Sequence, residues 1–365
     1  RKPVEVPWST IQEAGYDVVE ELGKGGQGTM YLCTSRTRAG RYCVKFYSKF
    51  DENAGGLEDL IEEYMLMMAL HNNHIAQTYQ VFQDHSCYYL VNEPYFGGDF
   101  TKLGRRAFDR GVRMGEAWWR ELFRQCLDGL SYLHSHGIIH ADIKEPNIMV
   151  AKDDSYASPC PVLIDFGLSR AFAAKRQGAS GTPGYIPPET WRSGLWYPRG
   201  DIFSLGVVFF QMMVGQVPSK TQAGALVPPG SDPEWASQNA SLPWDHFPAA
   251  MPELRSLVDQ MTFKERTKRP RPPQALDHSW FSSRSDAELP AASLRGLVGD
   301  SAADSQVIPG SLLVQRSPEA PWHLGGRAYQ ASPSMAPQAP SSPGSYGSGR
   351  RSSFSSPETP YGNGV

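Results

Sequence analysis

Residues 140–147 read His140-Ala141-Asp142-Ile143-Lys144-Glu145-Pro146-Asn147. Downstream of this stretch, the chain reads Leu163-Ile164-Asp165-Phe166-Gly167, with Asp165 18 positions after Asn147. Two further stretches follow in order, Gly181-Thr182-Pro183-Gly184-Tyr185-Ile186-Pro187-Pro188-Glu189 and Asp201-Ile202-Phe203-Ser204-Leu205-Gly206. The order and spacing of these four stretches decide which fold the chain can adopt.

A second informative region lies near the N-terminus, where strand-like runs surround a glycine-rich turn. The turn Gly23-Lys24-Gly25-Gly26-Gln27-Gly28 fits G-x-G-x-x-G, and its glycines let backbone N–H groups approach a polyphosphate closely. A flexible hairpin turn is the alternative interpretation. A dinucleotide-binding fold needs a helix directly after the glycines, whereas the strand-like run 30–33 follows here. A second run, 42–46, contains Lys45 near its end, so this order predicts an antiparallel meander with a phosphate-facing loop.

Apolar periodicity divides the rest of the chain into a short β-rich part and a longer helical part. Residues 57–70 have a helical spacing, and strand-like runs follow at 77–82 and 88–91. From Glu116 on the pattern is helical, with long segments at 116–136, 201–214 and 253–262. Near residue 282 the composition changes to Ser, Pro and Gly, which cannot bury enough apolar surface to offset chain ordering. The sequence therefore predicts a folded part over about 14–281 and a mostly disordered tail.

Composition and charge exclude several classes of protein. The 365 residues are 40% hydrophobic and 20% charged, with a formal net charge of −3. Near-neutral charge argues against a dedicated nucleic-acid binder, whose affinity depends on clustered Lys and Arg. The five cysteines are dispersed without a C-x-x-C pair, which is typical of reduced intracellular thiols rather than a disulfide framework or zinc site. No apolar run reaches the roughly 20 residues of a membrane-spanning helix.

Taken together, the motifs resemble those of eukaryotic protein kinases. Residues 140–147 resemble the catalytic loop H-R-D-L-K-x-x-N, residues 165–167 the metal-binding D-F-G, and residues 181–189 the motif that closes the activation segment. Arg269 lies where the family keeps an Arg that pairs with the last Glu of that motif, here Glu189. The runs 89–91, 97–99 and 275–281 are most similar to calmodulin-dependent and calcium-dependent Ser/Thr kinases, although the sequence contains no EF-hand pattern.

The resemblance implies an α+β, bilobal protein-kinase fold, with a small antiparallel β-sheet lobe that carries one helix and a larger, mainly helical lobe. It implies an N-terminal extension at 1–13, an N-lobe at 14–92, a C-lobe at 93–281 and a Ser/Pro/Gly-rich tail at 282–365. The expected cofactors are ATP and Mg²⁺, and the expected reaction is phosphoryl transfer to Ser or Thr hydroxyls of protein substrates.

The resemblance also gives the catalytic-loop residues roles in phosphoryl transfer, which depends mainly on positioning and charge neutralisation. Asp142 would accept the proton of the substrate hydroxyl, and Lys144 would steady the transferring group. Thr182 would bond to Asp142, which with Lys144 is typical of Ser/Thr rather than tyrosine kinases. Asn147 and Asp165 would bind Mg²⁺ through oxygen, the hard ligand that this ion prefers.

The nucleotide would lie beneath the glycine-rich loop, with Lys45 on its α- and β-phosphates. The partner of Lys45 is expected to be Glu63, with Glu62 as the alternative. The nucleotide-binding residues implied by the resemblance fall into four groups: Gly23, Gly25, Gly26 and Gly28 at the phosphates; Leu22, Met30, Cys43 and Met149 around the adenine; the backbone of Glu93 and Tyr95 at its edge, behind the gatekeeper Asn92; and Asp99 at the ribose.

Several positions depart from the family pattern. Ala141 replaces the Arg that normally clamps a phosphate on the activation loop, so we predict that activity does not depend strongly on phosphorylation there. Glu145-Pro146 inverts the common Pro-Glu order. In kinases that prefer basic substrates this Glu contacts an Arg of the substrate peptide, so the sequence does not decide whether this chain shares that preference. Cys43 replaces a small Ala, and we expect a buried, inert thiol. Residues 216–250 are rich in Pro, Ser and Gly where the family has a regular docking helix.

The sequence thus predicts a Ser/Thr protein kinase, because Lys45, Asp142, Asn147 and Asp165 are all present and a pseudokinase usually lacks at least one of them. The alternative is a catalytically weak, kinase-like scaffold that binds nucleotide and partner proteins. Expected partners are protein substrates and a regulatory protein at 216–250 or the tail, with no nucleic acid and no transmembrane segment. The expected location is intracellular and cytoplasmic, with the nucleus as the alternative; N-terminal targeting or lipidation is out of view because the chain starts at Arg1 without Met.

Overall fold

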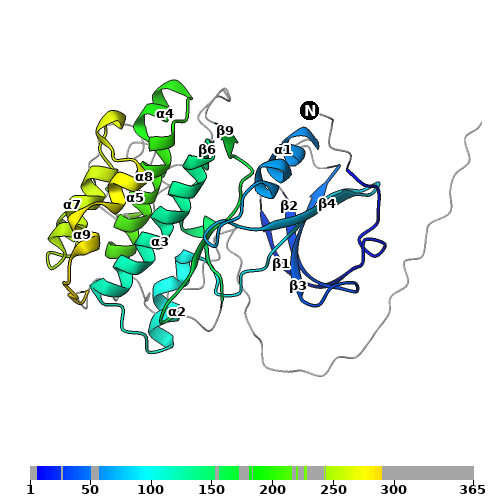
Figure 1. The fold of residues 1–365 in the computed structure, drawn as a ribbon, viewed down its shortest axis with the longest axis horizontal. Helices are drawn as coiled ribbons and strands as arrows, with labels where there is room; N and C mark the ends of the chain where they lie inside the picture. The colour runs from blue at the N-terminus through cyan, green and yellow to red at the C-terminus, as the bar shows by residue number, and fades with distance from the viewer. Residues whose placement is uncertain are drawn as a thin grey trace, which may run out of the picture. The chain divides into compact units, whose positions relative to one another are not determined.

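A computed structural model describes residues 6–25, 28–50, 57–152, 156–171, 181–182, 184–215, 219–220, 226–227, 242 and 244–289. An antiparallel sheet with one helix comes first along the chain, and a mainly helical region follows it (Figure 1). This order confirms the predicted α+β, bilobal fold. Among the described residues, no helix combines the length and hydrophobicity that a membrane span requires.

The first part is built on a five-stranded antiparallel sheet in the order β1-β2-β3-β5-β4. A side chain at Gly28 would collide with the carbonyl oxygen of Phe46, which explains the glycine there. Gly25 at the end of β1 pairs with Gly28 at the start of β2, and β2 pairs in turn with β3, so the predicted antiparallel meander is confirmed. The strands are β1 (Tyr16–Gly25), β2 (Gly28–Ser35), β3 (Arg41–Ser48), β4 (Thr78–Gln83) and β5 (Cys87–Asn92).

Residues 6–9, expected as part of a separate extension, pack on this sheet. Trp8 forms a parallel bridge with Gln83 of β4, and the Gln83 side chain donates a 3.0 Å hydrogen bond to the Val6 carbonyl. Val6 is buried in an apolar cluster with Leu60 of helix α1 (Leu57–Met68). The segment therefore covers the β4 edge, whose backbone groups would otherwise have no strand partner.

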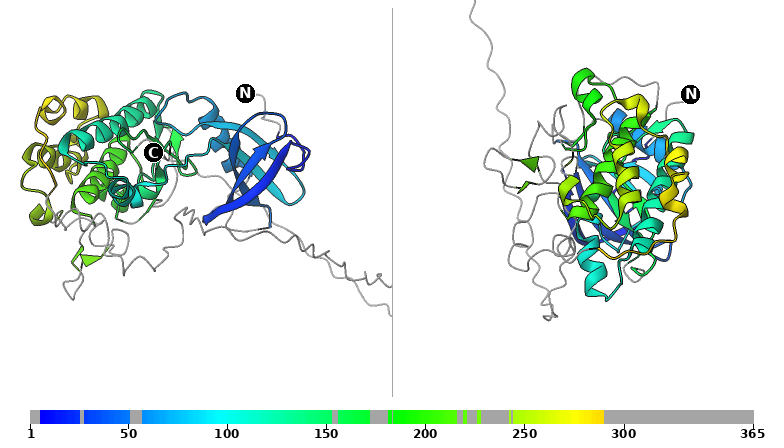
Figure 2. Two further views of the ribbon diagram at one scale, coloured as in Figure 1. Left: turned by 90° about the horizontal axis from the view of Figure 1, so that it is seen from below. Right: turned by 90° about the vertical axis from the view of Figure 1, so that its left-hand side faces the viewer.

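The helical part is organised around two long helices, α3 (Glu116–Ser135) and α5 (Pro198–Val214). They share one large apolar core, in which the rings of Phe123 and Phe209 stack with centroids 3.8 Å apart. Nearly every side chain of α5 is buried, which agrees with its almost continuous apolar sequence. Shorter helices surround the pair (Figure 2): α2 (Leu103–Asp109), α4 (Pro188–Ser193), α7 (Pro252–Met261), α8 (Pro272–Leu276) and α9 (Ser279–Ser282).

Short strand pairs frame residues 140–147. The stretch begins just after β6 (Ile138–Ile139), which pairs with β9 (Arg170–Ala171), and it ends at β7 (Ile148–Val150). Because β7 pairs with β8 (Pro161–Leu163), the Asp165 motif that follows β8 is brought back beside the 140–147 stretch. The remaining short elements are the 3₁₀ helices η1 (Phe100–Lys102), η2 (Glu145–Asn147), η3 (Trp244–His246) and η4 (Arg266–Lys268), and the strands β10 (Ser219–Lys220) and β11 (Leu226–Val227).

Packing continues beyond residue 281. Leu289 is buried in the large core, and Arg120 of α3 donates hydrogen bonds to the backbone carbonyls of Trp280 and Ser285. The sequence did not predict these contacts, because they join segments that lie far apart in the chain. The rest of the predicted tail, from residue 290 on, and most of residues 216–250 lie outside the described residues.

Candidate active site

A buried aspartate anchors residues 140–147 to the start of α5. The Asp201 carboxylate accepts 2.9 Å hydrogen bonds from the backbone N–H groups of His140 and Ala141, and it lies 2.9 Å from Nε2 of His134. Ala141 has a φ of 66°, in the left-handed region that non-glycine residues rarely adopt. The two hydrogen bonds hold this strained backbone in place. The sequence motif marks Asp201 only as a helix start, so this anchoring role emerges from the structure.

Asp142 is the centre of a hydrogen-bonded group of predicted catalytic residues. Thr182 donates to Oδ1 from its N–H at 3.1 Å and its hydroxyl at 2.7 Å, so the predicted contact is confirmed. Asn147 Nδ2 donates to Oδ2 at 2.9 Å and to the Asp142 carbonyl at 2.8 Å. Lys144 Nζ lies 2.8 Å from Oδ2 and donates to the Thr182 hydroxyl at 2.8 Å. Both carboxylate oxygens are thus held in a fixed orientation.

Lys45 of β3 meets the Asp165 motif across the two parts of the fold. Its Nζ lies 3.7 Å from Oδ1 of Asp165. Burial by itself would lower the pKa of Lys45, but the oxygens of Tyr47, Asp165 and Glu63 raise it above its ordinary value. The ammonium therefore keeps its charge at neutral pH. Lys45 in turn lowers the pKa of Asp165, with smaller contributions from Lys144 and His140.

Glu63 of α1 lies close to Lys45 and contacts Tyr47. Its side chain accepts a 3.0 Å hydrogen bond from the Tyr47 hydroxyl, whose ring centroid is 4.8 Å from the Lys45 ammonium. Glu63 is 8% exposed, whereas Glu62 is exposed, so burial favours Glu63 of the two alternatives. Sequence reasoning missed Tyr47, although its position two residues after Lys45 places both side chains on one face of β3.

The backbone of Asp165 is held by its own motif and by the aromatic rings of Phe166 and His140. Asp165 has a φ of 62°, so it too occupies the left-handed region, and the Gly167 N–H donates to its Oδ1 at 3.4 Å. The buried rings of Phe166 and His140 lie 4.9 Å apart, and His140 Nε2 is 3.0 Å from the Ile164 carbonyl. These contacts fix the direction in which the Asp165 carboxylate leaves the backbone.

The predicted adenine-binding residues lie on the sheet and on the segment after β5. Met30 pairs with Gly23 across the β1–β2 hairpin, and Cys43 pairs with Asn92 at the end of β5. Leu22, on β1, is half-buried. Burial raises the pKa of Cys43 to about 12, so its thiol stays protonated, as expected for an inert cysteine. Of the predicted phosphate-contacting glycines, Gly26 lies outside the described residues.

The segment after β5 is fixed by its own side chains. The Tyr95 hydroxyl accepts from the Gln77 N–H at 3.0 Å and donates to Glu93 at 3.1 Å, while the Glu93 N–H donates to the Gln77 carbonyl at 2.9 Å. Among the described residues, none forms a hydrogen bond with the Glu93 carbonyl or the Tyr95 N–H. These two groups therefore stay available to the edge of a planar ligand.

Asp99 and Met149, predicted for the ribose and the adenine, form an isolated bridge with each other. Asp99 is buried, and its Oδ1 accepts a 3.0 Å hydrogen bond from the Thr101 N–H at the start of η1. Burial raises the pKa of Asp99 above its ordinary value. One of the two Asp99 carboxylate oxygens therefore caps the start of η1.

Glu145, at the inverted Glu-Pro pair, points into the interior rather than to solvent. It is 3% exposed, its Oε2 accepts a hydrogen bond from the Tyr185 hydroxyl, and its Oε1 has no hydrogen-bond partner in the part of the chain that the structure describes. Tyr185 also lies 3.1 Å from Oε1 of Gln211 in α5. Burial raises the pKa of Glu145 to about 7. This carboxyl therefore ties the 140–147 stretch to the segment around residue 185.

The predicted pair of Arg269 with Glu189 is confirmed. Two guanidinium nitrogens of Arg269 lie 2.7 Å from the two carboxylate oxygens of Glu189. Arg269 is 1% exposed and also donates to the backbone carbonyls of Phe263 and Arg199. A bidentate pair with these added bonds fixes the position of α4 relative to the segment before α8.

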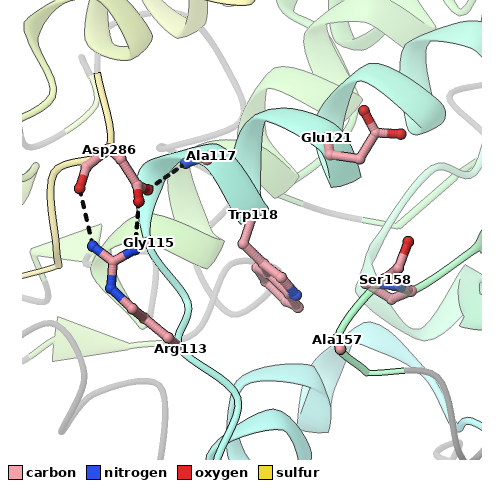
Figure 3. Close-up of a pocket in the computed structure, with 9 residues that line it drawn as sticks. Arg113, Gly115, Ala117, Trp118, Glu121, Ala157, Ser158 and Asp286 are labelled. Atoms are coloured by element: carbon pink, nitrogen blue, oxygen red, sulfur yellow. Dashed lines mark hydrogen bonds and ion pairs between the residues drawn. The ribbon is translucent and has the colours of Figure 1, made fainter. Parts of the chain in front are cut away.

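A surface pocket of about 320 Å³ lies elsewhere in the helical part (Figure 3). Trp118 forms part of its wall, and Asp286 accepts hydrogen bonds from Arg113 and from the Ala117 N–H at its edge. None of the residues predicted from the sequence for phosphoryl transfer lines it. The candidate site is therefore the group around Asp142, Lys45 and Asp165, and not this pocket.

Comparison with known proteins agrees with this geometry. The family model described as "Protein kinase domain" matches residues 16–281. The calcium/calmodulin-dependent protein kinase type II alpha chain of Drosophila melanogaster is 28% identical over 283 residues, covering 74% of this chain and 49% of that protein. The type II kinase of Caenorhabditis elegans is 29% identical over 76% of this chain and 37% of its own length. The calcium/calmodulin-dependent protein kinase type 1 of C. elegans is 30% identical over 60% of this chain and 61% of its own length. The chain thus spans about half the length of the curated relatives it matches.

Proposed function

The chain belongs to the protein kinase domain family, and from this premise we propose that it transfers the γ-phosphoryl group of ATP to Ser or Thr hydroxyls of protein substrates. The observation that carries the proposal is the group around Asp142. Its two oxygens are held by Thr182, Asn147 and Lys144 at 2.7–3.1 Å, the arrangement that a positioned general base needs.

In the proposed reaction, Asp142 lies beside the substrate hydroxyl and accepts its proton as the oxygen attacks the γ-phosphorus. The bond from that phosphorus to the β-phosphate oxygen breaks, and ADP leaves with the electron pair. Lys144, between Asp142 and Thr182, is placed to balance negative charge on the transferring group. Lys45 would hold the α- and β-phosphates, and Glu63 with Tyr47 would hold Lys45.

Asn147 and Asp165 fit the requirements of Mg²⁺ sites. Asn147 uses its Nδ2 group for both hydrogen bonds to Asp142, so its Oδ1 oxygen remains for a metal. Lys45 keeps the pKa of Asp165 low, so that carboxylate is ionised at neutral pH. Both donors are oxygens, which Mg²⁺ prefers. When bound, the metal would neutralise charge on the phosphates, and these two residues would position it.

The base of the nucleotide would lie against Leu22, Met30, Cys43 and Met149, with its edge at the Glu93 carbonyl and the Tyr95 N–H. Support comes from the absence of hydrogen-bond partners for these two backbone groups among the described residues. The buried Asp99 would bind the ribose through the carboxylate oxygen that does not cap η1. Gly23, Gly25, Gly26 and Gly28 would cover the phosphates from above.

Partners and location complete the proposal. The partners would be proteins with Ser or Thr acceptors and a regulatory protein that binds at 216–250 or the tail, which lie mostly outside the described residues. The protein would act inside the cell, in the cytoplasm. The alternative of a catalytically weak scaffold would keep nucleotide binding but lack the Asp142-dependent step.

The decisive experiment measures ADP release with a mixture of Ser- and Thr-containing peptides. Asp142→Asn should lower the rate by about 10²–10⁴, the usual contribution of a positioned general base. Asp259→Asn, at an exposed aspartate of α7, is the matched control and should leave the rate unchanged. Equal rates for the parent and Asp142→Asn would instead support the scaffold.

A further inference from the structure

A second cavity, of about 660 Å³, lies between the C-terminal end of α3, the start of α5 and the segment that leads into α8. Its walls include Arg199, Arg266 and Arg271, together with His134, Tyr197 and prolines. None of the residues proposed for phosphoryl transfer lines it. We refer to it as the arginine cavity.

The three arginines of this cavity carry charge that no carboxylate of the described residues neutralises. Among the described residues, the Arg199 side chain donates only to the Thr267 carbonyl, and the Arg266 guanidinium stacks 3.5 Å from the centroid of the Tyr197 ring. Burial lowers the pKa of Arg199, and the charges of Arg271, Arg266 and Arg269 lower it further. The cations therefore repel one another in the described structure.

The carboxylates near the three arginines already bind other groups. Glu189 binds both guanidinium nitrogens of Arg269, and Glu265 lies 2.8 Å from the ammonium of Lys268. Asp201 is buried against His134 and two backbone N–H groups. Because none of these oxygens pairs with the three arginines, an anion from outside the chain would remove an existing repulsion as well as gain new hydrogen bonds.

The geometry also indicates the kind of anion. Tyr197 is the N-cap residue of the 17-residue helix α5 and makes no side-chain capping bond, so the positive end of that helix adds to the guanidinium charges. Planar guanidinium groups match the oxygens of a phosphate. The volume lies within the roughly 300–1,000 Å³ of typical ligand pockets, and Tyr197 and the prolines give it apolar walls.

We propose that the arginine cavity binds a phosphorylated serine or threonine of a peptide segment, with Arg266 and Arg271 on the phosphate and the flanking residues against the apolar walls. Such a site would let the protein hold a protein that has already been phosphorylated. The inference does not depend on the phosphoryl-transfer activity, because it concerns binding alone.

Fluorescence anisotropy of the full chain, without ATP, tests the proposal. The probe is a short labelled peptide whose only charged side chain is a central phosphoserine between alanine and proline. We expect saturable binding of this probe and none of its unphosphorylated form. Arg271→Gln and Arg266→Gln should each weaken binding about tenfold, as expected for loss of one charge-assisted interaction. Arg192→Gln, at an exposed arginine of α4, should leave it unchanged.

Two further measurements keep the test decisive. Arg271→Lys should recover part of the affinity lost in Arg271→Gln, since it restores the positive charge at this exposed position of the cavity wall. Inorganic phosphate should compete only at concentrations well above those of the phosphopeptide. The proposal is overturned if the Gln variants bind as the parent does, if the unphosphorylated peptide binds equally, or if inorganic phosphate binds as tightly as the peptide.

Discussion

At the residue scale, Ala141 and Asp165 of the candidate site both have left-handed backbone conformations. Neither is glycine, so each conformation costs on the order of 1–3 kcal/mol and persists because surrounding bonds enforce it. At Ala141 those bonds come from Asp201. The precision of the site therefore depends on a side chain that contributes no chemistry of its own.

Replacing Asp201 should affect both the stability of the fold and the activity of the site. Asp201→Ala leaves two buried N–H groups without acceptors, at about 1–3 kcal/mol each, and should lower both the free energy of unfolding and the rate of ADP release. Asp201→Asn keeps one acceptor oxygen and should recover part of each. Urea denaturation and a steady-state assay of both variants provide the check. Unchanged activity in Asp201→Ala would contradict the anchoring role.

Glu145 gives a pH-dependent prediction at the same scale. Its pKa rises from an ordinary 4.5 to about 7 on folding, so the native state binds a proton that the unfolded state releases over that range. The parent should therefore lose stability relative to Glu145→Gln as the pH rises from about 4.5 to about 7, by on the order of 3 kcal/mol. Urea denaturation between pH 5 and 8 measures the difference. A difference that stays constant with pH would refute a buried, titrating Glu145.

At the scale of elements, Arg269 and Glu189 join α4 to the segment before α8. Arg269→Ala removes a buried cation that makes a bidentate pair and leaves Glu189 without its partner, so the free energy of unfolding should fall by about 3–5 kcal/mol. Lys268→Ala, at the neighbouring exposed pair with Glu265, is the control and should change it little. Thermal denaturation of both variants provides the measurement. An equal loss of stability in Arg269→Ala and Lys268→Ala would contradict the role given to the buried pair.

The elements themselves were largely predictable from local pattern. Helices expected at 57–70, 116–136, 201–214 and 253–262 are found within a few residues of those bounds, and the strands on either side of the glycine-rich stretch pair as expected. Periodicity reports which face of a segment is apolar, so it locates helices and strands well.

What the sequence did not predict depends on contacts between distant segments. The pairing of Trp8 with Gln83, the packing of Leu289 in the core and the hydrogen bond from Tyr47 to Glu63 each join residues whose partners no local pattern specifies. The motif residues Asp142, Lys144, Asn147 and Thr182 were predictable because their spacing is itself the signal. Asp201 and Glu145 were quoted in motifs, yet their burial and partners came only from the fold.

At the scale of the whole molecule, we propose that groups from the sheet and from the helical part act on one nucleotide. The 3.7 Å approach of Lys45 to Asp165 is the contact that joins them. The two residues lie far apart in the sequence, and only the folded chain brings their opposite charges together. Tyr47 and Asp165 raise the pKa of Lys45 despite its burial, and Lys45 lowers the pKa of Asp165, so both groups stay charged, as the proposed binding of a polyphosphate and its metal requires.

The most direct test measures binding of a fluorescent ATP analogue as Mg²⁺ is titrated, in the parent, Lys45→Met, Asp165→Asn and the surface control Asp259→Asn. We predict that Mg²⁺ tightens binding in the parent and the control, that Asp165→Asn removes most of the Mg²⁺ dependence, and that Lys45→Met weakens binding at every Mg²⁺ concentration. Identical, Mg²⁺-independent binding in all four proteins would contradict the account.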